Sequence, residues 1–196
     1  MFNIDELYNE KYCAKIDAKA WRFNLIPPTV KVLYNHFNPE SVIDVGCANG
    51  LHLKAFKDLG VECLFGTEGA IHWASYIEKY FGDQYVILDL RLPFPHIRKF
   101  DLVICFEVLE HLEKSHSSQA VNNLCGLGDT LCISACSVSG GFHHFNPQPK
   151  EYWIKKFESR DFHYCEDEVD KLQSIFQDTR CSGWFKTGLK VFRKDT

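Results

Sequence analysis

Residues 41–50, SVIDVGCANG, decide the fold class, because a short run of β-branched residues leads directly into a turn of small residues. The first five residues have the pattern of a buried strand and include one acidic side chain, Asp44. Gly46, Ala48 and Gly50 allow a sharp turn and a close approach of the backbone to a ligand. The N–H groups at the start of the next helix are free to bind that ligand. By itself the stretch fits a nucleotide-binding loop and a plain strand-to-helix turn equally well.

The chain around this stretch alternates between strand and helix patterns. We expect strands over residues 41–45, 62–68, 85–90, 101–106, 129–138, 162–166 and 188–194, with helices between them. Such alternation predicts βαβ units, which form a mostly parallel sheet with helices on both faces. The change of pattern near the C-terminus predicts an antiparallel strand at one edge.

A chain of 196 residues with 45% hydrophobic residues is long enough to build one substantial core. We therefore expect a single domain over residues 1–196. It would consist of a helical flank or lid over residues 1–38 and an α/β core over residues 39–196. The prolines in IPP, residues 26–28, predict a break in the flank before a short helix over residues 29–37.

Composition limits the compartment and the partners. The net charge is −4 and the basic residues are scattered, which argues against a large nucleic-acid interface. The nine cysteines include no C-x-x-C pair, so we expect free, buried thiols in a reducing compartment. No apolar run approaches the roughly 20 residues that a membrane-spanning helix needs. We therefore expect a soluble, cytoplasmic protein without a membrane partner, whose oligomeric state the sequence does not define.

Acidic residues end three successive strands of the predicted sheet. Asp44 lies in the first strand, Glu68 closes the second, and Asp89 closes the third. Ligands of open α/β sheets bind beyond the carboxyl ends of the strands, where these side chains meet. Glu68 lies 18 residues after Gly50, a spacing that suits a carboxylate binding the two hydroxyls of a ribose. The three acids predict one cofactor pocket.

Over roughly residues 39–137, these motifs resemble those of the class I S-adenosylmethionine-dependent methyltransferases. The shared motifs are VIDVGCANG, Glu68, LDL at residues 88–90, and DLVICFEVLEHL at residues 101–112. The resemblance implies a Rossmann-like, seven-stranded sheet with an antiparallel last strand, and S-adenosylmethionine as cofactor. It implies that the cofactor is bound by Asp44, Gly46, Cys47, Ala48, Gly50, Glu68, Gly69, Asp89, Leu90 and Phe106. Ala48 departs from the family, which often has glycine there.

Two other classes of protein are compatible with parts of this pattern. A nicotinamide-dependent oxidoreductase would need glycine at positions 46, 48 and 51, where the chain has Ala48 and Leu51 in the last two places. A methyltransferase fold that acts only as a binding subunit would keep the sheet but fail to bind the cofactor. Binding of S-adenosylmethionine distinguishes the expected enzyme from both.

The segment CFEVLEHLEK, residues 105–114, follows the fourth strand and gathers groups that can bind a metal. Glu107, Glu110 and His111 would share one face of a helix, beside the expected methyl donor. The loop GGFHHFNPQP, residues 140–149, follows the fifth strand, so His143 or His144 would complete the site. We choose His144 because it directly precedes the turn FNPQP.

The pattern E-x-x-E-H with a later histidine resembles the metal site of small-RNA 2′-O-methyltransferases, and E-x-x-E-H alone resembles that of ubiquinone-pathway O-methyltransferases. The resemblance implies a divalent metal, Mn²⁺ or Mg²⁺, with Glu107, His111 and His144 in catalytic positions. The alternative is a metal-free enzyme in which His111 or His144 acts as the general base.

The acceptor is expected to be an oxygen atom. The chain lacks the Asp/Asn-Pro-Pro-Tyr segment of enzymes that methylate amino groups of bases, and the Pro-Cys nucleophile of cytosine carbon-5 enzymes. A sugar or glycan, or another small acceptor with two neighbouring hydroxyls, fits the acidic charge better than an RNA ribose, which stays as the alternative. Four aromatic residues are candidates either for acceptor selection or for the core: Tyr8, Tyr12, Trp21 and Trp153.

Overall fold

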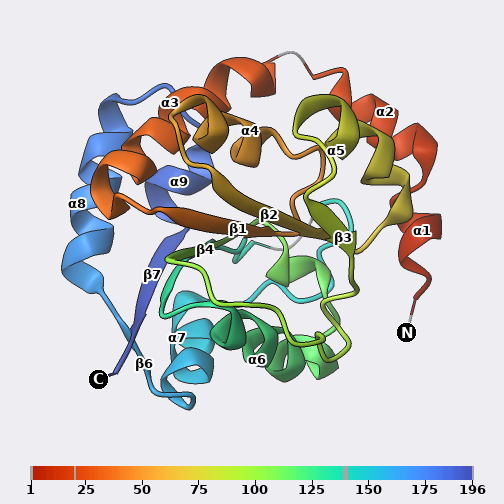
Figure 1. Cartoon of the computed structure of the whole chain (residues 1–196). Coiled ribbons are helices and arrows are strands. Elements are labelled where there is room, and N and C mark those ends of the chain that lie inside the picture. Colours follow the sequence, from red (N-terminus) through yellow and green to blue (C-terminus); the bar gives the residue numbers. More distant parts are fainter. Residues whose placement is uncertain (1, 20, 139–140, 196) are drawn as a thin grey trace.

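The computed structural model describes residues 2–19, 21–138 and 141–195, and its centre is a seven-stranded sheet (Figure 1). The strands follow the order β3-β2-β1-β4-β5-β7-β6. Their bounds are β1 Ser41–Val45, β2 Cys63–Glu68, β3 Tyr85–Ile87, β4 Leu102–Phe106, β5 Thr130–Ser134, β6 Phe162–Tyr164 and β7 Leu189–Lys194. β7 pairs antiparallel with both β5 and β6, and the other strand pairs of the sheet are parallel. The expected methyltransferase-type sheet, with an antiparallel last strand, is therefore confirmed.

Helices cover both faces of the sheet. They are α1 Ile4–Leu7, α2 Glu10–Asp17, α3 Trp21–Phe37, α4 Leu51–Asp58, α5 Ala74–Tyr80, α6 Ser117–Leu127, α7 Lys150–Glu158, α8 Glu166–Asp178 and α9 Gly183–Thr187. Three 3₁₀ turns join them: η1 Ile71–Trp73, η2 Leu109–His111 and η3 Lys114–His116. In Figure 1, α3, α4 and α5 lie above the sheet, and α6 and α7 lie below it.

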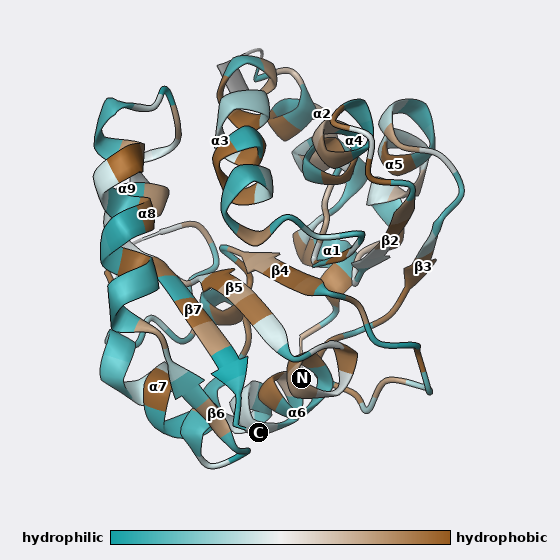
Figure 2. Ribbon diagram, turned by 60° about the vertical axis from the view of Figure 1, so that its left-hand side comes forward, coloured by the Kyte–Doolittle hydropathy of each residue, from teal (hydrophilic) through white to brown (hydrophobic). Residues whose placement is uncertain are grey.

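Alternation along the strands divides the core into two clusters. Val42, Leu102 and Ile104 face the cluster that includes residues of α3, α4 and α8. Ile43 and Val103 face the cluster that includes residues of α6 and α7. Successive side chains of a strand point to opposite faces, so continuous apolar strands need helices on both sides. Figure 2 shows this as hydrophobic colour along β4 and β5, while α8 is largely hydrophilic outside.

The expected break at Pro27 and Pro28 is wrong, because α3 continues through both prolines. Proline removes the N–H that would bond the carbonyl four residues earlier, which usually ends a helix. Here Val30 and Leu33 are fully buried, and α3 packs against α4 and α8. The hydroxyl of Thr29 also donates to the carbonyl of Leu25 at 2.8 Å. Burial of one face therefore outweighs the lost backbone bonds.

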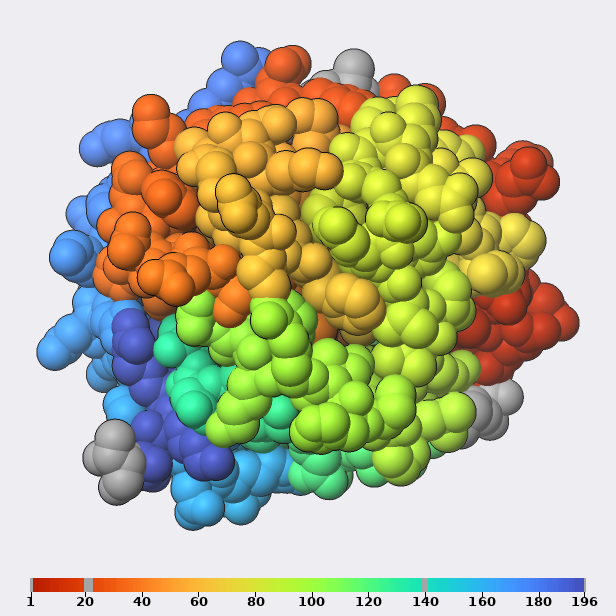
Figure 3. All heavy atoms as spheres, viewed as in Figure 1, coloured from red at the N-terminus to blue at the C-terminus, as the bar shows by residue number. Residues whose placement is uncertain are grey.

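The N-terminal helices lie at the carboxyl ends of the strands. Figure 1 shows α1 and α2 beside β3 and α5, and Figure 3 shows the N-terminal residues in red at the opposite side of the molecule from the C-terminal residues in blue.

All nine cysteines are free, as expected, but only four are buried: Cys13, Cys47, Cys105 and Cys132. No helix in the described parts of the chain has the length and apolar character needed to cross a membrane.

Candidate functional site

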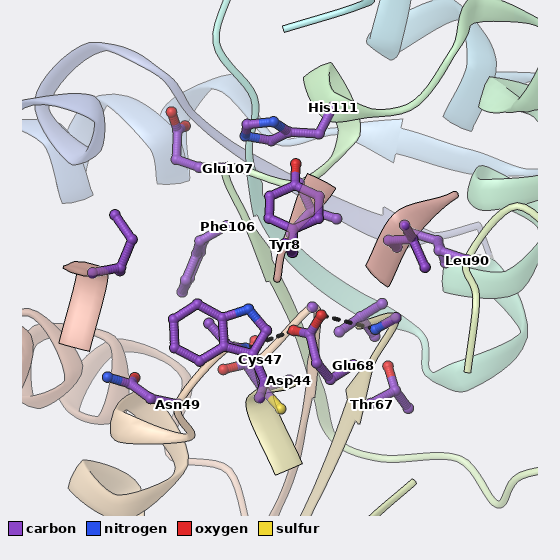
Figure 4. Close-up of a pocket in the computed structure, with 18 of the residues that line it drawn as sticks. Tyr8, Asp44, Cys47, Asn49, Thr67, Glu68, Leu90, Phe106, Glu107 and His111 are labelled. Carbon is purple, nitrogen blue, oxygen red and sulfur yellow. Dashed lines mark hydrogen bonds between the residues drawn. The ribbon is translucent and has the colours of Figure 1, made fainter. Parts of the chain in front are cut away.

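A cavity of about 470 Å³ lies where the carboxyl ends of β1, β2 and β4 meet the N-terminal helices (Figure 4). It is lined by every cofactor residue expected from the sequence except Gly50: Asp44, Gly46, Cys47, Ala48, Glu68, Gly69, Asp89, Leu90 and Phe106. Gly50 lies outside the lining, caps α4 with a φ of 73°, and packs close to Phe81. Glycine at position 50 is therefore needed for the turn, and this residue does not face the cavity.

The loop after β1 is tight because its backbone is held by β2. The N–H groups of Gly46 and Cys47 both donate to the carbonyl of Thr67, at 2.8 and 3.0 Å. Gly46 has a φ of 78°, and a Cβ placed there would lie 2.5 Å from a methyl group of Val108. Ala48 also has a positive φ, 48°, in the region that favours glycine. The loop therefore presents its backbone directly to the cavity.

Glu68 fixes the end of β2 against this loop. One carboxylate oxygen accepts from the N–H of Ala48 at 2.8 Å, and the other accepts from Gly69 and Ala70 at 2.9 and 3.1 Å. Burial raises the pKa of Glu68, and these three N–H groups act in the opposite direction. Asp44 lies nearby, and burial together with the charge of Glu68 raises its pKa to about 8.

Asp89 lies two residues beyond the end of β3, because this strand stops at Ile87 and not at position 90 as expected. Its carboxylate accepts three hydrogen bonds from the Arg91 side chain, at 2.7–3.0 Å. Burial alone would raise the pKa of Asp89, but Arg91 lowers it below the ordinary value. The same guanidinium donates to the carbonyl of Phe2 at 2.9 Å, so this side of the cavity is tied to the N-terminal segment.

The helical flank closes over the cavity, as a lid would. Asp5 accepts from the N–H of Ile71 at 2.9 Å and links α1 to η1. Tyr8 and Tyr12 line the cavity, and Figure 4 shows Tyr8 between Glu68 and His111. The Tyr8 ring meets that of His111 edge-on at a centroid distance of 6.0 Å.

The aromatic candidates thus divide between the site and the core. Tyr8 and Tyr12 contribute to the cavity, while Trp153 is fully buried in the core cluster next to α6 and α7. The side chain of Trp21 lies outside the described residues.

The helix after β4 begins only at Ser117, as α6, and this corrects the expectation that Glu107, Glu110 and His111 share a helical face. Glu107 has a left-handed φ of 55°, and only Leu109–His111 form a 3₁₀ turn, η2. The N–H of Glu107 donates to both the carbonyl and the hydroxyl of Ser134, each at 3.1 Å. These bonds turn the chain sharply where β4 ends.

Glu110, His111 and His144 nevertheless come together, with their ligand atoms all within 4.8 Å of one another. Glu107 and His143 are not members of this group. Glu110 is fully buried, and neither carboxylate oxygen has a hydrogen-bond partner among the described residues. Burial and then the charge of Glu107 raise the pKa of Glu110 well above its ordinary value, while the backbone N–H groups of Glu110 and Cys136 act in the opposite direction. A buried carboxylate whose oxygens have no hydrogen-bond partner is one that a cation would satisfy.

His111 and His144 each place a ring nitrogen within 4.8 Å of a carboxylate oxygen of Glu110. Nδ1 of His111 lies 3.1 Å from the carbonyl oxygen of His143, and Nδ1 of His144 lies 3.5 Å from that of Val138. Burial, followed by His144, lowers the pKa of His111 to about 4, so its imidazole is neutral near pH 7. One carboxylate and two imidazoles therefore fit a divalent cation, which the structure itself does not contain.

Sequence reasoning missed several residues of the site. Lys190 in β7 is buried, and its ammonium group donates to the carbonyls of Gly188 and Ala135 at 2.8 and 3.5 Å. Burial lowers its pKa, and the charges of Glu107 and Glu110 oppose this change. A lysine inside the apolar strand LKVF was the available signal. Lys190 does not line the cavity, and the lining residues that carried no local signal are Lys15, Lys19, Asn49, His52 and Trp184.

Comparisons with known proteins agree with this fold. Residues 18–125 match the family model described as "Methyltransferase domain". A tRNA U34 carboxymethyltransferase from Vibrio cholerae is 28% identical over 131 residues, which cover 63% of this chain and 39% of that protein. The chain therefore spans about two fifths of the length of the curated relatives it matches.

Solved structures of methyltransferases share the architecture at low sequence identity. A TehB-like SAM-dependent methyltransferase from Corynebacterium glutamicum superposes with a TM-score of 0.71, at 16% identity, over 95% of this chain and 97% of that one. The sugar N-methyltransferase KedS8 from Streptoalloteichus gives a TM-score of 0.69, at 16% identity, over 94% and 93%. These likenesses concern the fold alone.

The family model covers more than half of the chain, and the seven-stranded sheet agrees with it. The chain belongs to the methyltransferase domain family.

Proposed function

We propose that this chain transfers the methyl group of S-adenosylmethionine to a hydroxyl of a sugar, a glycan or another small acceptor with two neighbouring hydroxyls. A divalent cation, Mn²⁺ or Mg²⁺, assists the transfer. Membership of the methyltransferase family supports the cofactor, and the pocket at the carboxyl ends of β1, β2 and β4 is where such a ligand binds in an open α/β sheet.

The cofactor would lie along the row of strand ends. Glu68 would accept hydrogen bonds from the ribose hydroxyls, since its carboxylate is fixed at the end of β2 and faces the cavity. Asp89 and Leu90 would flank the adenine, beyond β3. Gly46 and the loop after it would border the methionine half, with the backbone close enough for direct contact.

One observation carries the metal-assisted part of the proposal: the fully buried Glu110 carboxylate, without a donor among the described residues, faces two imidazoles. Glu110, His111 and His144 would hold the cation, with Glu107 beside them. When bound, the cation supplies a positive charge that lowers the pKa of an acceptor hydroxyl and orients it. The buried Lys190 ammonium adds a fixed positive charge near Glu107 and Glu110.

The surroundings suit a ring-shaped acceptor beside this cluster. Tyr8, Tyr12 and Phe142 line the same cavity as His111 and His144, and the Tyr12 and Phe142 rings stack at a centroid distance of 4.9 Å. Their apolar surfaces exclude water and offer flat contact to a sugar ring. The structural neighbour KedS8 is a sugar N-methyltransferase, but its likeness to this chain concerns the fold and does not identify the acceptor.

An RNA ribose is the second candidate acceptor, because the Vibrio cholerae relative acts on tRNA by its name. The net charge of −4 and the scattered basic residues favour the small acceptor over a polymer of phosphates. A metal-free route with a histidine base is the alternative mechanism. His111 is a weak base at a pKa of about 4, which leaves His144 for that role.

The proposal is tested by binding before activity, since binding needs no acceptor. Chelator-treated protein is titrated with Mn²⁺ by electron paramagnetic resonance and with S-adenosylhomocysteine by calorimetry. We expect Glu110→Gln to weaken Mn²⁺ binding by at least about tenfold while S-adenosylhomocysteine binds as before. Glu151→Gln, at an exposed position of α7, is the matched control.

Activity then follows from a screen of sugars and nucleosides with vicinal hydroxyls. We expect the chelator to abolish methyl transfer and added Mn²⁺ or Mg²⁺ to restore it. Full activity in the chelated enzyme would refute the metal and favour His144 as general base. Tight binding of NAD without binding of S-adenosylhomocysteine would refute the cofactor.

A further inference from the structure

We infer that Asn146 is a positioning residue, which holds the loop of residues 141–149 so that His144 faces Glu110 and His111. We call this segment the histidine loop. The inference rests on the proposed metal-assisted function, because it concerns how the third ligand is brought to the other two.

Asn146 connects the histidine loop to Glu110 and to Ser117, the first residue of α6. Its backbone N–H donates to the carbonyl of Glu110 at 2.9 Å, and its side-chain amide donates to the hydroxyl of Ser117 at 2.9 Å. Asn146 is 2% exposed and Ser117 is fully buried. Gln148 completes the set by donating to the Asn146 side-chain oxygen at 2.8 Å. A buried amide whose nitrogen and oxygen are both hydrogen-bonded has one preferred orientation.

A second attachment lies on the other side of His144. The carbonyl of His143 accepts from the ring of His111 at 3.1 Å, three residues before Asn146. His144 therefore lies between two hydrogen-bonded anchors, and both anchors end on the turn that carries the other two ligands. The contact between Nδ1 of His144 and the carbonyl oxygen of Val138 is long at 3.5 Å and exposed. The anchors, more than the contacts of the His144 ring, set where the ring lies.

The histidine loop needs such anchors because its backbone is not part of a regular element. His143 has a left-handed φ of 56°, an arrangement that is strained for a non-glycine residue. Phe142 and Phe145 are both exposed by more than two fifths, so burial of aromatic rings holds this segment only in part. Loss of the Asn146–Ser117 bond would release the loop and spread His144 over several positions.

Metal affinity is the readout, because a merely structural asparagine would change stability without favouring one ligand site over the other. Mn²⁺ affinity is measured by electron paramagnetic resonance, and Co²⁺ absorption reports the ligand geometry independently. We expect Asn146→Ala to weaken Mn²⁺ binding about tenfold or more, the size of effect that residues supporting metal ligands have, with S-adenosylhomocysteine affinity unchanged within about twofold. Ser117→Ala should show the same pattern to a smaller degree, and Ser117→Thr, which keeps the hydroxyl, should restore binding.

Matched controls are available on the surface. Asn35→Ala changes an exposed asparagine of α3, and Ser118→Ala changes the exposed neighbour of Ser117 in α6. Neither should alter Mn²⁺ affinity. Circular dichroism of each variant establishes that it is folded.

The outcomes separate this inference from the proposed function. Wild-type protein that binds neither Mn²⁺ nor Co²⁺ would refute the proposed metal and, with it, the inference. Wild-type protein that binds metal while Asn146→Ala and Ser117→Ala bind it equally well would overturn the inference alone. Equal losses of metal and S-adenosylhomocysteine binding in both variants would also overturn it, since Asn146 would then support the whole fold.

Discussion

The carbonyl oxygen of His143 lies 3.1 Å from Nδ1 of His111, and this contact fixes which ring nitrogen of His111 is free. A carbonyl only accepts hydrogen bonds, so Nδ1 must carry the proton and donate it. Nε2 of the neutral ring then has a lone pair and no proton. A backbone carbonyl behind a histidine in this way is the usual arrangement of a metal-binding imidazole.

Substitution of His111 can separate this bond from the binding of a metal. The amide of asparagine reproduces the position of Nδ1 and keeps the bond to the His143 carbonyl, but it has no group at the place of Nε2. We expect His111→Asn to weaken Mn²⁺ binding about 10- to 100-fold and to change the free energy of unfolding by less than about 1 kcal/mol. His111→Ala should lose both the hydrogen bond to the His143 carbonyl and the binding of Mn²⁺. Similar Mn²⁺ affinity in His111→Asn and wild type, measured by the same titration, would exclude His111 as a ligand.

Gly141 tests the position of His144 without changing any polar group. A Cβ at Gly141 would lie 2.2–2.5 Å from three atoms of the His144 ring, so an alanine must displace the ring. We expect Gly141→Ala to weaken Mn²⁺ binding several-fold and to leave S-adenosylhomocysteine binding unchanged. Gly126→Ala in α6 is the control, since no described atom lies within 4 Å of the Cβ it would add. Equal Mn²⁺ affinity in the two variants would mean that His144 does not hold the ion.

The sequence predicted the sheet well because its signals are local. Buried strands such as β1 and β4 are mostly apolar runs, and the rule that ligands bind at the carboxyl ends of strands predicted that Asp44 and Glu68 share one cavity, as they do. The meeting of Glu110 with His144 also followed from adjacent strand ends. In each case neighbouring strands, and not distant side chains, decide the arrangement.

What could not be predicted depends on contacts between distant parts of the chain. The helix after β4 starts later than expected, at Ser117, and the residues directly after the strand form a left-handed Glu107 and a 3₁₀ turn, because the N–H of Glu107 donates to Ser134 in β5. Asn146 had no local pattern, since its partner Ser117 is 29 residues away. Pro27 stays inside α3 because tertiary burial outweighs its local preference.

Glu68 is expected to recognise the ribose of the cofactor. Glu68→Ala should weaken S-adenosylhomocysteine binding by about 1–3 kcal/mol, the cost of leaving polar partners unsatisfied. The residue also holds the loop after β1 through Ala48, so affinity alone does not separate the two roles. The 2′,3′-dideoxy analogue of the ligand does separate them: wild-type protein should bind it more weakly than the parent, and Glu68→Ala should bind both alike. Calorimetry with Glu62→Gln, at an exposed position, is the control.

Discrimination against the dideoxy analogue that persists in Glu68→Ala would assign the ribose to another residue. Glu68 would then be a support for the loop only.

Far from the pocket, Glu168 joins three elements through charged hydrogen bonds. Its carboxylate accepts from Arg193 of β7 at 2.6 and 3.1 Å and from the ring of His36 of α3 at 2.8 Å. The bonds from Arg193, and then that from His36, lower the pKa of Glu168 to about 2 against a partial burial that acts the other way. The folded pKa is below the unfolded one, so the unfolded state binds more protons between the two values and stability falls as the pH drops through this window.

We therefore expect Glu168→Gln to lower the free energy of unfolding by about 1 kcal/mol at pH 7, a modest value because the group is partly exposed. The difference from wild type should be constant above about pH 5 and should shrink as the pH falls from about 4.5 towards 2, where wild-type Glu168 is itself protonated. Urea titrations of both proteins at pH 7, 5, 4 and 3.5 measure it. Asp58→Asn, which disrupts the exposed pair with Lys54 on α4, is the control and should cost less than about 0.5 kcal/mol. A Glu168→Gln deficit that stays the same from pH 7 to 3.5 would mean that packing, and not the ionised carboxylate, joins α3, α8 and β7.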